Sequence, residues 1–139
     1  MRTIDRLTPE QRRRAMTNVR SKDTGIEVAV RSALHARGLR FRKHVRHLPG
    51  TPDIVFSRAR VAVFVDGDFW HGWRFPTWRH KLSTYWDAKI ERNRRRDRRN
   101  FARLRRQGWL VVRVWEHDVL ADVDRVADRI ENAVRARGS

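Results

Sequence analysis

Cysteine is absent from this sequence of 139 residues. Its absence excludes disulfide bonds and every zinc site that depends on thiolate ligands. Long apolar runs are missing as well: no stretch approaches the ~20 residues that a membrane-spanning helix needs, and the N-terminal residues contain no apolar signal-peptide core. We therefore expect a soluble, cytoplasmic protein with no membrane partner.

Acidic residues are scarce relative to basic ones. The chain has 33 Lys and Arg residues against 16 Asp and Glu residues, which gives a formal net charge of +17 at pH 7. A charge of this size opposes a compact fold unless the protein binds a polyanion. Nucleic acid is the leading candidate, which would place the protein on the nucleoid. An anionic membrane surface is the alternative, and it is disfavoured because no basic amphipathic helix ends in free aromatic residues.

The hydrophobic pattern predicts one α/β domain over residues 1–139, with a mixed sheet flanked by helices. Predicted helices cover residues 8–20, 24–38, 83–107 and 123–134. Predicted strands cover residues 39–43, 52–56, 61–65 and 109–115, and the last is expected in the centre of the sheet, packed on both faces. We expect residues 1–7 and 137–139 to be disordered and residues 72–82 to be irregular.

The apolar, β-branched run Val61–Val65 is followed directly by acidic, histidine and aromatic residues. A tight turn joins this run to the strand before it, so the two strands should form an antiparallel hairpin. Antiparallel pairing brings the start of one strand to the end of the other. We therefore expect Asp53, Val65 and Asp66 to meet at one edge of the sheet, with His71 a short loop away.

These side chains point to metal-dependent chemistry on a phosphodiester. Carboxylates repel phosphate, so an acidic pocket in a polyanion-binding protein needs a cation, and Mg²⁺ with oxygen ligands is the candidate. Asp53 is the first candidate ligand. Asp66 and Asp68 are further candidates, although aspartates beside Gly67 are also ordinary turn residues. His71 has the chemistry of a general base for an attacking water.

The long predicted helix carries two polar residues on its apolar stripe. That stripe consists of Trp86, Ile90, Asn93, Asp97, Phe101 and Leu104. An unpaired carboxylate is costly on a buried face, so Asp97 must have a partner there. The partner is either an arginine in a buried salt bridge or a site residue such as His71, which Asp97 would then orient.

The opposite face of the same helix is rich in arginine. It carries Arg92, Arg95, Arg96, Arg99, Arg103 and Arg106. A run of charge is usually a solvated helix face, but acids are too few nearby for i,i+4 pairing to explain these arginines. We expect contacts with DNA phosphates, with Arg92, Arg96, Arg99 and Asn93 as the candidate DNA-binding residues.

Phe69 and Trp70 precede His71 directly. Two adjacent large side chains of an extended segment cannot both point into the core, so at least one should be exposed. An exposed aromatic ring beside a phosphodiester-cleaving site would stack on bases or wedge between them. The alternative is a hydrophobic plug over the end of the hairpin.

Three other polar residues have simpler explanations. Glu27 lies in the first turn of a helix, where a capping box with Thr24 accounts for it. His44 and His47 have no partner at metal-ligand spacing, and we expect them to be solvated or to face phosphate.

The motifs taken together resemble the very short patch repair DNA mismatch endonucleases, from about residue 12 to about residue 120. The matching residues are Met16, Val19, Asp23-Thr-x-x-Glu27, Leu48-Pro-Gly-x-Pro-Asp53, Phe64, Gly67-x-Phe-Trp-His71, Trp86, Lys89-Ile90, Asn93, Arg96-Asp97, Gly108-Trp and Val114-Trp-Glu116. The combination of the Leu-Pro-Gly-x-Pro-Asp and Phe-Trp-His motifs is specific, whereas either motif alone is weak.

The resemblance implies a restriction-endonuclease-like fold and a Mg²⁺-dependent nick at a T/G mismatch in double-stranded DNA, leaving 5′-phosphate and 3′-hydroxyl ends. It implies that Asp53 and the backbone carbonyl of Val65 bind the metal, and that Glu27 acts on metal-bound water. His71 would be the base. The wedge beside the mismatch would consist of Met16, Phe69 and Trp70.

The sequence also departs from the family. Well-known members hold a structural zinc ion with three cysteines and a histidine, and this chain has Asp68, Trp73 and His117 near the corresponding positions. We expect no structural zinc, and hypothesise that Asp68 pairs with His117 under Trp73 in its place. Asp66 stands where the family often has histidine, and Val65 where it has threonine.

Two alternatives stay open. One is a restriction-type nuclease without mismatch preference, and the other is a non-catalytic module that binds mismatches. A monomer is expected, because a nick needs only one active site, and repair proteins are candidate partners.

Overall fold

A computed structural model describes residues 24–138 of the chain. The helix predicted over residues 8–20 lies outside the described residues, and so does Met16.

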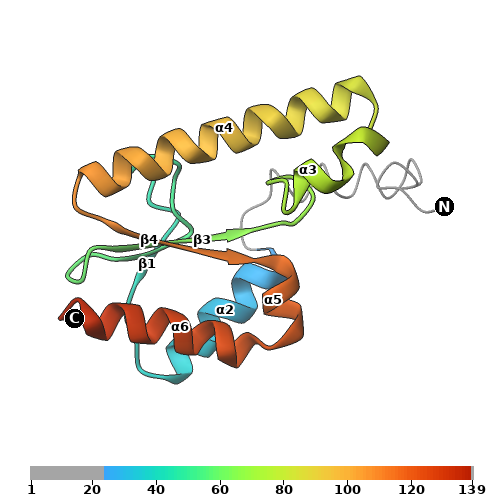
Figure 1. Ribbon diagram of the computed structural model, residues 1–139. Helices are drawn as coiled ribbons and strands as arrows, with labels where there is room; N and C mark the ends of the chain where they lie inside the picture. Colours follow the sequence, from blue (N-terminus) through green and yellow to red (C-terminus); the bar gives the residue numbers. More distant parts are fainter. Residues whose placement is uncertain (1–23, 139) are drawn as a thin grey trace.

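The protein has a mixed α/β fold in three layers (Figure 1). The middle layer is a four-stranded sheet with the strand order β1 (Arg42–Lys43), β2 (Ile54–Phe56), β3 (Val61–Asp66) and β4 (Leu110–Trp115). One face is covered by the long helix α4 (Thr84–Arg106), and the other by α2 (Gly25–Ala36), α5 (Glu116–Ala121) and α6 (Val123–Ala136). This is the predicted α/β class, with the mixed sheet and flanking helices of a restriction-endonuclease-like fold.

The predicted hairpin is confirmed, and β3 lies inside the sheet. Strands β2 and β3 pair antiparallel, with Ile54 opposite Val63, whereas β3 and β4 run parallel, with Val65 opposite Val114. The prediction that 109–115 is central is wrong, because β4 ends the order of the described strands. Its apolar run reflects helices over both faces of the sheet, and a hydrophobic pattern does not report how many strands flank a strand.

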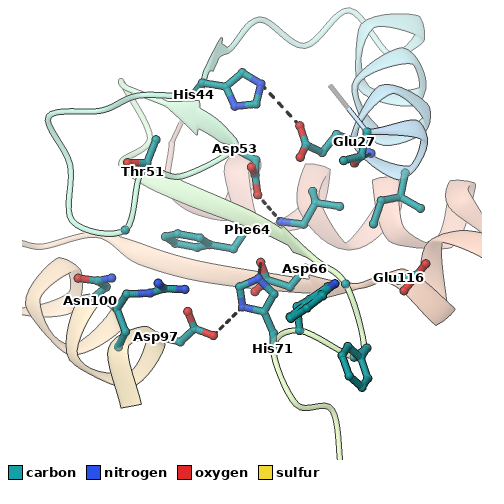
Figure 2. A pocket seen from close by; sticks show the side chains of 18 of the residues that line it. Glu27, His44, Thr51, Asp53, Phe64, Asp66, His71, Asp97, Asn100 and Glu116 are labelled. Carbon is teal, nitrogen blue, oxygen red and sulfur yellow. Dashed lines mark hydrogen bonds and ion pairs between the residues drawn. The ribbon is translucent and has the colours of Figure 1, made fainter. Parts of the chain in front are cut away.

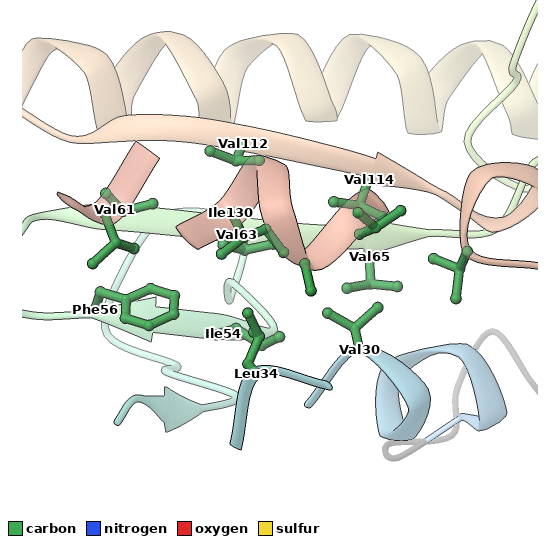
Figure 3. Close-up of a cluster of buried hydrophobic side chains, with 14 of the residues drawn as sticks. Val30, Leu34, Ile54, Phe56, Val61, Val63, Val65, Val112, Val114 and Ile130 are labelled. Carbon is green, nitrogen blue, oxygen red and sulfur yellow. The ribbon is translucent and has the colours of Figure 1, made fainter. Parts of the chain in front are cut away.

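Alternate residues of β3 enter two different cores. Val61, Val63 and Val65 pack toward α2 and α6 in a cluster that also contains Val30, Leu34, Val114 and Ile130 (Figure 3). Ala62 and Phe64 face α4, where they meet Phe101 and Leu104. Because side chains of a strand alternate between faces, Asp66 belongs to the second series and is carried to the α4 side of the sheet.

Side-chain hydroxyl groups cap the starts of α2 and α4, and the cap of α2 at Thr24 is the predicted one. The hydroxyl oxygen of Ser83 accepts a hydrogen bond from the N–H of Trp86 at the start of α4, and that of Thr24 accepts one from Glu27 at the start of α2, each at 3.4 Å. No helix within residues 24–138 is long and apolar enough to cross a membrane.

The connection from β3 to α4 is more regular than predicted. It contains the short helix α3 (Phe75–Trp78) and the 3-10 turn η2 (Arg79–Lys81). Phe75 is fully buried and anchors this segment beneath the guanidinium groups of Arg79 and Arg94. A single buried aromatic ring leaves no periodic signal in the sequence, so the hydrophobic pattern did not reveal α3 and η2.

Candidate active site

Asp53 lies directly before β2, where the hairpin carries it to the end of β3. Its N–H donates to the carbonyl of Val63 at 3.0 Å, and its Oδ2 accepts from the N–H of Val65 at 2.7 Å. Burial raises the pKa of Asp53 to about 8, against the lowering effect of the Val65 N–H, and the charges of Glu27 and Asp66 add to the rise. The charged form of Asp53 is therefore unfavourable in this site, and a bound cation would stabilise it.

Glu27 and His44 lie beside Asp53 (Figure 2). Glu27 is 6% exposed in the first turn of α2, and its Oε2 is 3.6 Å from Nε2 of His44. The prediction that His44 is solvated is wrong, because its side chain is only 13% exposed, and the alternative that it faces phosphate stays a prediction. Ligand atoms of Glu27, His44 and Asp53 lie within 4.8 Å of one another, close enough for one metal ion.

The backbone explains how His44 reaches this cluster. Its N–H donates to the carbonyl of Asp53 at 3.1 Å, which continues the pairing of β1 with β2. His44 has a φ of +51°, a left-handed conformation that is uncommon for a residue with a side chain. Spacing along the chain could not reveal His44, since its partners are 17 positions before it and nine after it.

A second cluster forms around His71 on the α4 side of the sheet (Figure 2). Nδ1 of His71 lies 2.7 Å from Oδ2 of Asp97, and Nε2 lies 3.4 Å from Oδ1 of Asp66. Arg113 donates through Nε to Asp66 at 2.8 Å and through a terminal nitrogen to Asp97 at 2.7 Å. Both partners considered for Asp97, the arginine and the site histidine, are therefore present.

The charges of this second cluster shift the ionisation of its members. Burial raises the pKa of Asp66, and the positive charges of His71 and Arg113 oppose that rise. Burial alone would lower the pKa of His71, but the hydrogen bond to Asp97 and the attraction of both carboxylates outweigh it, so the pKa is raised. His71 therefore keeps its proton to a higher pH than a free histidine.

The chain turns sharply after His71. Gly72 has a φ of +71°, and a Cβ atom there would lie 2.9 Å from Cγ2 of Ile90 and 2.7 Å from Cδ of Arg94. Glycine is thus needed for the loop to lie against α4, and this close approach places His71 beside Asp97.

The two clusters line one cavity of about 750 Å³. Glu27, His44 and Asp53 belong to its lining, as do Asp66, His71 and Asp97. Carboxylate oxygens and imidazole nitrogens are a donor set that fits divalent metal ions. The N–H and C=O of a strand residue point to the same side, so the carbonyl of Val65 projects toward Asp53 and adds an oxygen donor.

The aromatic residues of the loop pack together. Trp70 is 7% exposed and lies with ring centroids 5.2 Å from Trp86, and Phe69 is half-buried and stacks on Trp78 at 6.0 Å. The prediction that one of the two rings is exposed is wrong. Residues 68–74 form turns, not an extended strand, so alternation did not apply. Asn93 donates to the carbonyl of Trp70 at 2.9 Å and thereby holds this loop to α4.

The arginines of α4 divide into two groups. Arg95 forms an i,i+4 pair with Glu91 at 3.5 Å, so the expectation that no such pairing occurs is wrong for that residue. Arg92, Arg96 and Arg99 are exposed, and none of them pairs with an acidic side chain within residues 24–138. Arg96 also lines the cavity, which joins this positive face to the acidic site.

The expected contact in place of the zinc site is present. Nδ1 of His117 lies 2.9 Å from Oδ1 of Asp68, and the ring of Trp73 packs on that of His117 with centroids 3.9 Å apart. Glu116 accepts a hydrogen bond from the N–H of Asp68 at 3.2 Å. The loop that carries His71 is thus fastened to the start of α5 without cysteine.

Comparison with known proteins shows the family of the chain. A family model described as "DNA mismatch endonuclease Vsr" matches residues 4–76, a stretch that includes Glu27, Asp53, Asp66 and His71. The chain is 49% identical to the type II nicking enzyme V.XorIIP of Xanthomonas oryzae pv. oryzae, over 92% of this chain and 95% of that relative. It is 44% identical to the type II nicking enzyme V.NmeDIP of Neisseria meningitidis serogroup C, over 95% of this chain and 91% of the relative.

A further relative is itself named as a DNA mismatch endonuclease. The DNA mismatch endonuclease Vsr of Escherichia coli K12 is 34% identical, over 92% of this chain and 86% of the relative. The similarity therefore spans nearly the whole length of each protein. The chain belongs to the Vsr family of DNA mismatch endonucleases.

Proposed function

We propose that this protein nicks one strand of double-stranded DNA at a T/G mismatch in a Mg²⁺-dependent reaction that leaves 5′-phosphate and 3′-hydroxyl ends. The observation that carries the proposal is the convergence of Glu27, Asp53 and His71 on one cavity in a chain with a formal net charge of +17. The positive surface suits phosphate binding, and a divalent ion reconciles phosphate with the acidic groups. The name of the Escherichia coli relative supports the mismatch as the target.

The metal is assigned to the Asp53 side of the cavity. Asp53, Glu27, His44 and the carbonyl of Val65 would hold it, and when bound it supplies positive charge to the scissile phosphate. The raised pKa of Asp53 fits this assignment, because burial and the neighbouring charges of Glu27 and Asp66 disfavour the carboxylate, and a bound cation would stabilise it. Glu27 then lies where it can accept a hydrogen bond from a water in the same cavity.

His71 is the proposed base. Its Nδ1 bonds to Asp97, and Nε2, which lies 3.4 Å from Oδ1 of Asp66, is the nitrogen that would accept a proton from the attacking water once His71 is neutral. The oxygen of that water forms a new bond to phosphorus, the bond from phosphorus to the 3′ oxygen breaks, and the 3′ oxygen takes a proton from solvent water as it leaves. One active site suffices for one nick, so we propose that the protein acts as a monomer.

Phe69 and Trp70, with Met16, form the proposed wedge beside the mismatch. In the described structure the two rings pack against Trp78 and Trp86, so wedging requires the loop to open when DNA binds. Arg92, Arg96 and Arg99 are the proposed phosphate contacts on α4.

A nicking assay tests the proposal. Three duplexes of one sequence, containing T/G, another mismatch or no mismatch, are incubated with Mg²⁺ and wild-type protein, Asp53→Asn, or Arg125→Gln. Arg125 is exposed on α6, on the far face of the sheet, so its variant is the matched control. We expect nicking of the T/G duplex by wild type and control, and binding without nicking by Asp53→Asn. No cleavage of any duplex with any divalent ion would refute the proposal.

A second candidate is a nicking enzyme without mismatch preference. It is favoured by the names of the relatives at 44% and 49% identity, which state nicking but no mismatch. Equal nicking of the T/G duplex and the fully paired duplex would select this candidate over the first.

A further inference from the structure

The end of the sheet that lies opposite the candidate active site is strongly basic. At that end the β2–β3 turn, the last turn of α4 and the last turn of α6 lie together (Figure 1). The three segments that meet there, residues 56–61, 101–110 and 132–138, contain arginine but no Asp or Glu. The charge carried by these segments is therefore of one sign.

Two arginines of this end are held by neutral groups. Arg60 donates to the carbonyl of Gln107, the residue that follows α4. Arg137 donates through Nε to the carbonyl of Ala59 at 3.0 Å and through a terminal nitrogen to that of Gly108 at 2.7 Å. A carbonyl oxygen fixes the position of a guanidinium group but, unlike a carboxylate, does not neutralise its charge.

Helix capping explains those two side chains but not three further arginines. Arg58 lies in the β2–β3 turn, and Arg103 and Arg106 lie in the last turn of α4; all three are exposed, and none forms an ion pair within residues 24–138. The acidic residue of α6 nearest to this end, Glu131, accepts hydrogen bonds from other arginines. The exposed charge is thus left for a partner. We define the distal patch as Arg58, Arg60, Arg103, Arg106 and Arg137.

A row of exposed arginines on α4 connects the cavity to the distal patch. Its members follow one another at alternating steps of four and three residues, which keeps them on one face of the helix. They are Arg92, Arg96, Arg99, Arg103 and Arg106. Arg96 lines the cavity, and Arg106 ends the helix. A polyanion that enters the cavity can therefore follow positive charge as far as the distal patch.

The length of these elements converts the separation into base pairs. A helix rises about 1.5 Å per residue, so α4 covers about 20 Å between Arg92 and Arg106. A strand rises about 3.3 Å per residue, so β3 separates Arg60 from Asp66 by about the same distance. Successive base pairs of a duplex are about 3.4 Å apart, which places the distal patch about six base pairs from the cavity.

The opposite end of α4 differs in charge. There Arg79 donates to Asp87 and to Glu91, in each case at 3.0 Å, and Glu91 also lies 3.5 Å from Arg95. The acidic side chains at this end neutralise the arginines beside them. Exposed charge without an acidic partner therefore extends from the cavity in one direction along α4.

We propose that the distal patch binds the phosphates of duplex DNA about six base pairs to one side of the nicked bond, so that tight binding needs a long duplex arm on that side alone. The continuity of the arginine row with the cavity favours DNA over an anionic membrane, because the molecule that is cut passes over the same row. The inference rests on the proposed function, which places the nicked bond in the cavity.

Duplexes with unequal arms test the proposal by binding alone. Fluorescence anisotropy is measured in EDTA, so that no strand is cut, over a range of salt. One T/G duplex has two arms of about 12 base pairs, twice the reach of the distal patch, and two others have one arm or the other cut to about three base pairs, half that reach. For wild type, we expect shortening of one particular arm to reduce the magnitude of the slope of log K against log salt by about two or more, and shortening of the other arm to leave it unchanged.

A double variant assigns the effect to the distal patch. On the long duplex, Arg103→Gln/Arg106→Gln should have a slope about two smaller in magnitude than wild type, and shortening the sensitive arm should then cause little further loss. Arg58→Gln, in a different element, should reduce the slope by about one on the long duplex only. The control is Arg125→Glu, which removes the same two units of charge on α6 and should keep the arm dependence of wild type. Circular dichroism establishes that each variant is folded.

Several results would overturn the proposal. They are failure of wild type to bind the long duplex, equal sensitivity of wild type to both arms or to neither, and an arm dependence in Arg103→Gln/Arg106→Gln that matches wild type. The wild-type result decides the matter even if the double variant fails to fold. If wild type nicks no duplex but binds with the expected arm dependence, the proposed function fails while the distal patch stands. If wild type nicks T/G duplexes and neither arm matters, the distal-patch inference alone fails.

Discussion

Nδ1 of His71 lies 2.7 Å from Oδ2 of Asp97, a contact that joins the loop after β3 to the long helix α4. A carboxylate in this position fixes the tautomer of the ring and favours its protonated form. We predict that Asp97→Asn lowers kcat for nicking by about 100-fold or more, because the amide no longer stabilises the imidazolium that forms when His71 accepts a proton.

The same variant should also shift the pH dependence of kcat in a defined direction. Asp97 raises the pKa of His71, so its removal should move the acid limb of kcat toward lower pH. The double variant Asp97→Asn/His71→Ala should lose little more activity than His71→Ala alone, since the two residues act as one unit. Additive losses would show that Asp97 acts elsewhere.

The raised pKa of Asp53 predicts how the stability of the metal-free protein changes with pH. Its carboxyl has a pKa of about 8 in the folded state, against 3.8 for an unperturbed aspartate. Below the lower of these two pKa values, the carboxyl is protonated in both the folded and the unfolded state, so it does not lower the free energy of unfolding. Between the two values the unfolded state releases the proton more readily, so the stability of the folded state falls as pH rises. In EDTA, the thermal midpoint of wild type should therefore drop from pH 5 to pH 8 more than that of Asp53→Asn.

Added Mg²⁺ supplies the control for this prediction. Metal binding requires the carboxylate, so Mg²⁺ should raise the thermal midpoint of wild type strongly at pH 8 and little at pH 5. Asp53→Asn should show no such difference. Parallel melting curves for wild type and Asp53→Asn across this pH range would contradict the assignment of the shift to Asp53.

Much of the fold was predictable because local signals agreed. The apolar alternation and tight turn around Val61–Val65 predicted the hairpin, and the hairpin predicted the meeting of Asp53, Val65 and Asp66. The stripe of α4 predicted that Asp97 needs a partner. These inferences depend on strand and helix geometry, which the sequence expresses over a few neighbouring residues.

The parts that sequence did not reveal depend on contacts between distant segments. His44 joins the Asp53 side through a left-handed residue at the end of β1, and no spacing rule indicates that turn. Arg113 looked like one polar position in a strong strand, and only the packing of β4 beneath α4 brings it to Asp66 and Asp97. Trp70 is buried because the loop after β3 folds back on α4, which alternation cannot foresee.

The Asp68–His117 pair predicts a measurable coupling. The two side chains are 29% and 34% exposed, so solvent weakens their interaction, and a double-mutant cycle with Asp68→Asn and His117→Ala should give about 0.5–1 kcal/mol of coupling in urea unfolding. Trp73→Ala should cost more than either change, since it uncovers the pair. Treatment with a zinc chelator should leave the unfolding midpoint of wild type unchanged. A midpoint that falls with the chelator and recovers with zinc would refute the zinc-free anchor.

Phe69 is the cleaner residue for testing the aromatic wedge. Trp70 is 7% exposed, so Trp70→Ala would leave a cavity and destabilise the protein by about 3–5 kcal/mol. Phe69 is half-buried, and we predict that Phe69→Ala reduces the ratio of T/G binding to paired-duplex binding about tenfold, as expected for the loss of one stacked ring. Leu120→Ala, at a residue 73% exposed on α5, is the control and should not change the ratio. A uniform loss on both duplexes in Phe69→Ala would remove the ring from mismatch recognition.

The exposed arginines of α4 should contact phosphates rather than bases. Each phosphate contact releases counterions and contributes about −0.9 to the slope of log K against log salt for duplex DNA. We predict that Arg92→Gln, Arg96→Gln and Arg99→Gln each reduce the magnitude of that slope by about one, measured by fluorescence anisotropy over a range of salt. Because phosphates carry no sequence information, each variant should weaken binding equally on T/G and paired duplexes. Arg125→Gln makes the same change of charge on α6, so an equal reduction of the slope in that variant would mean that net charge, and not the α4 face, sets the affinity.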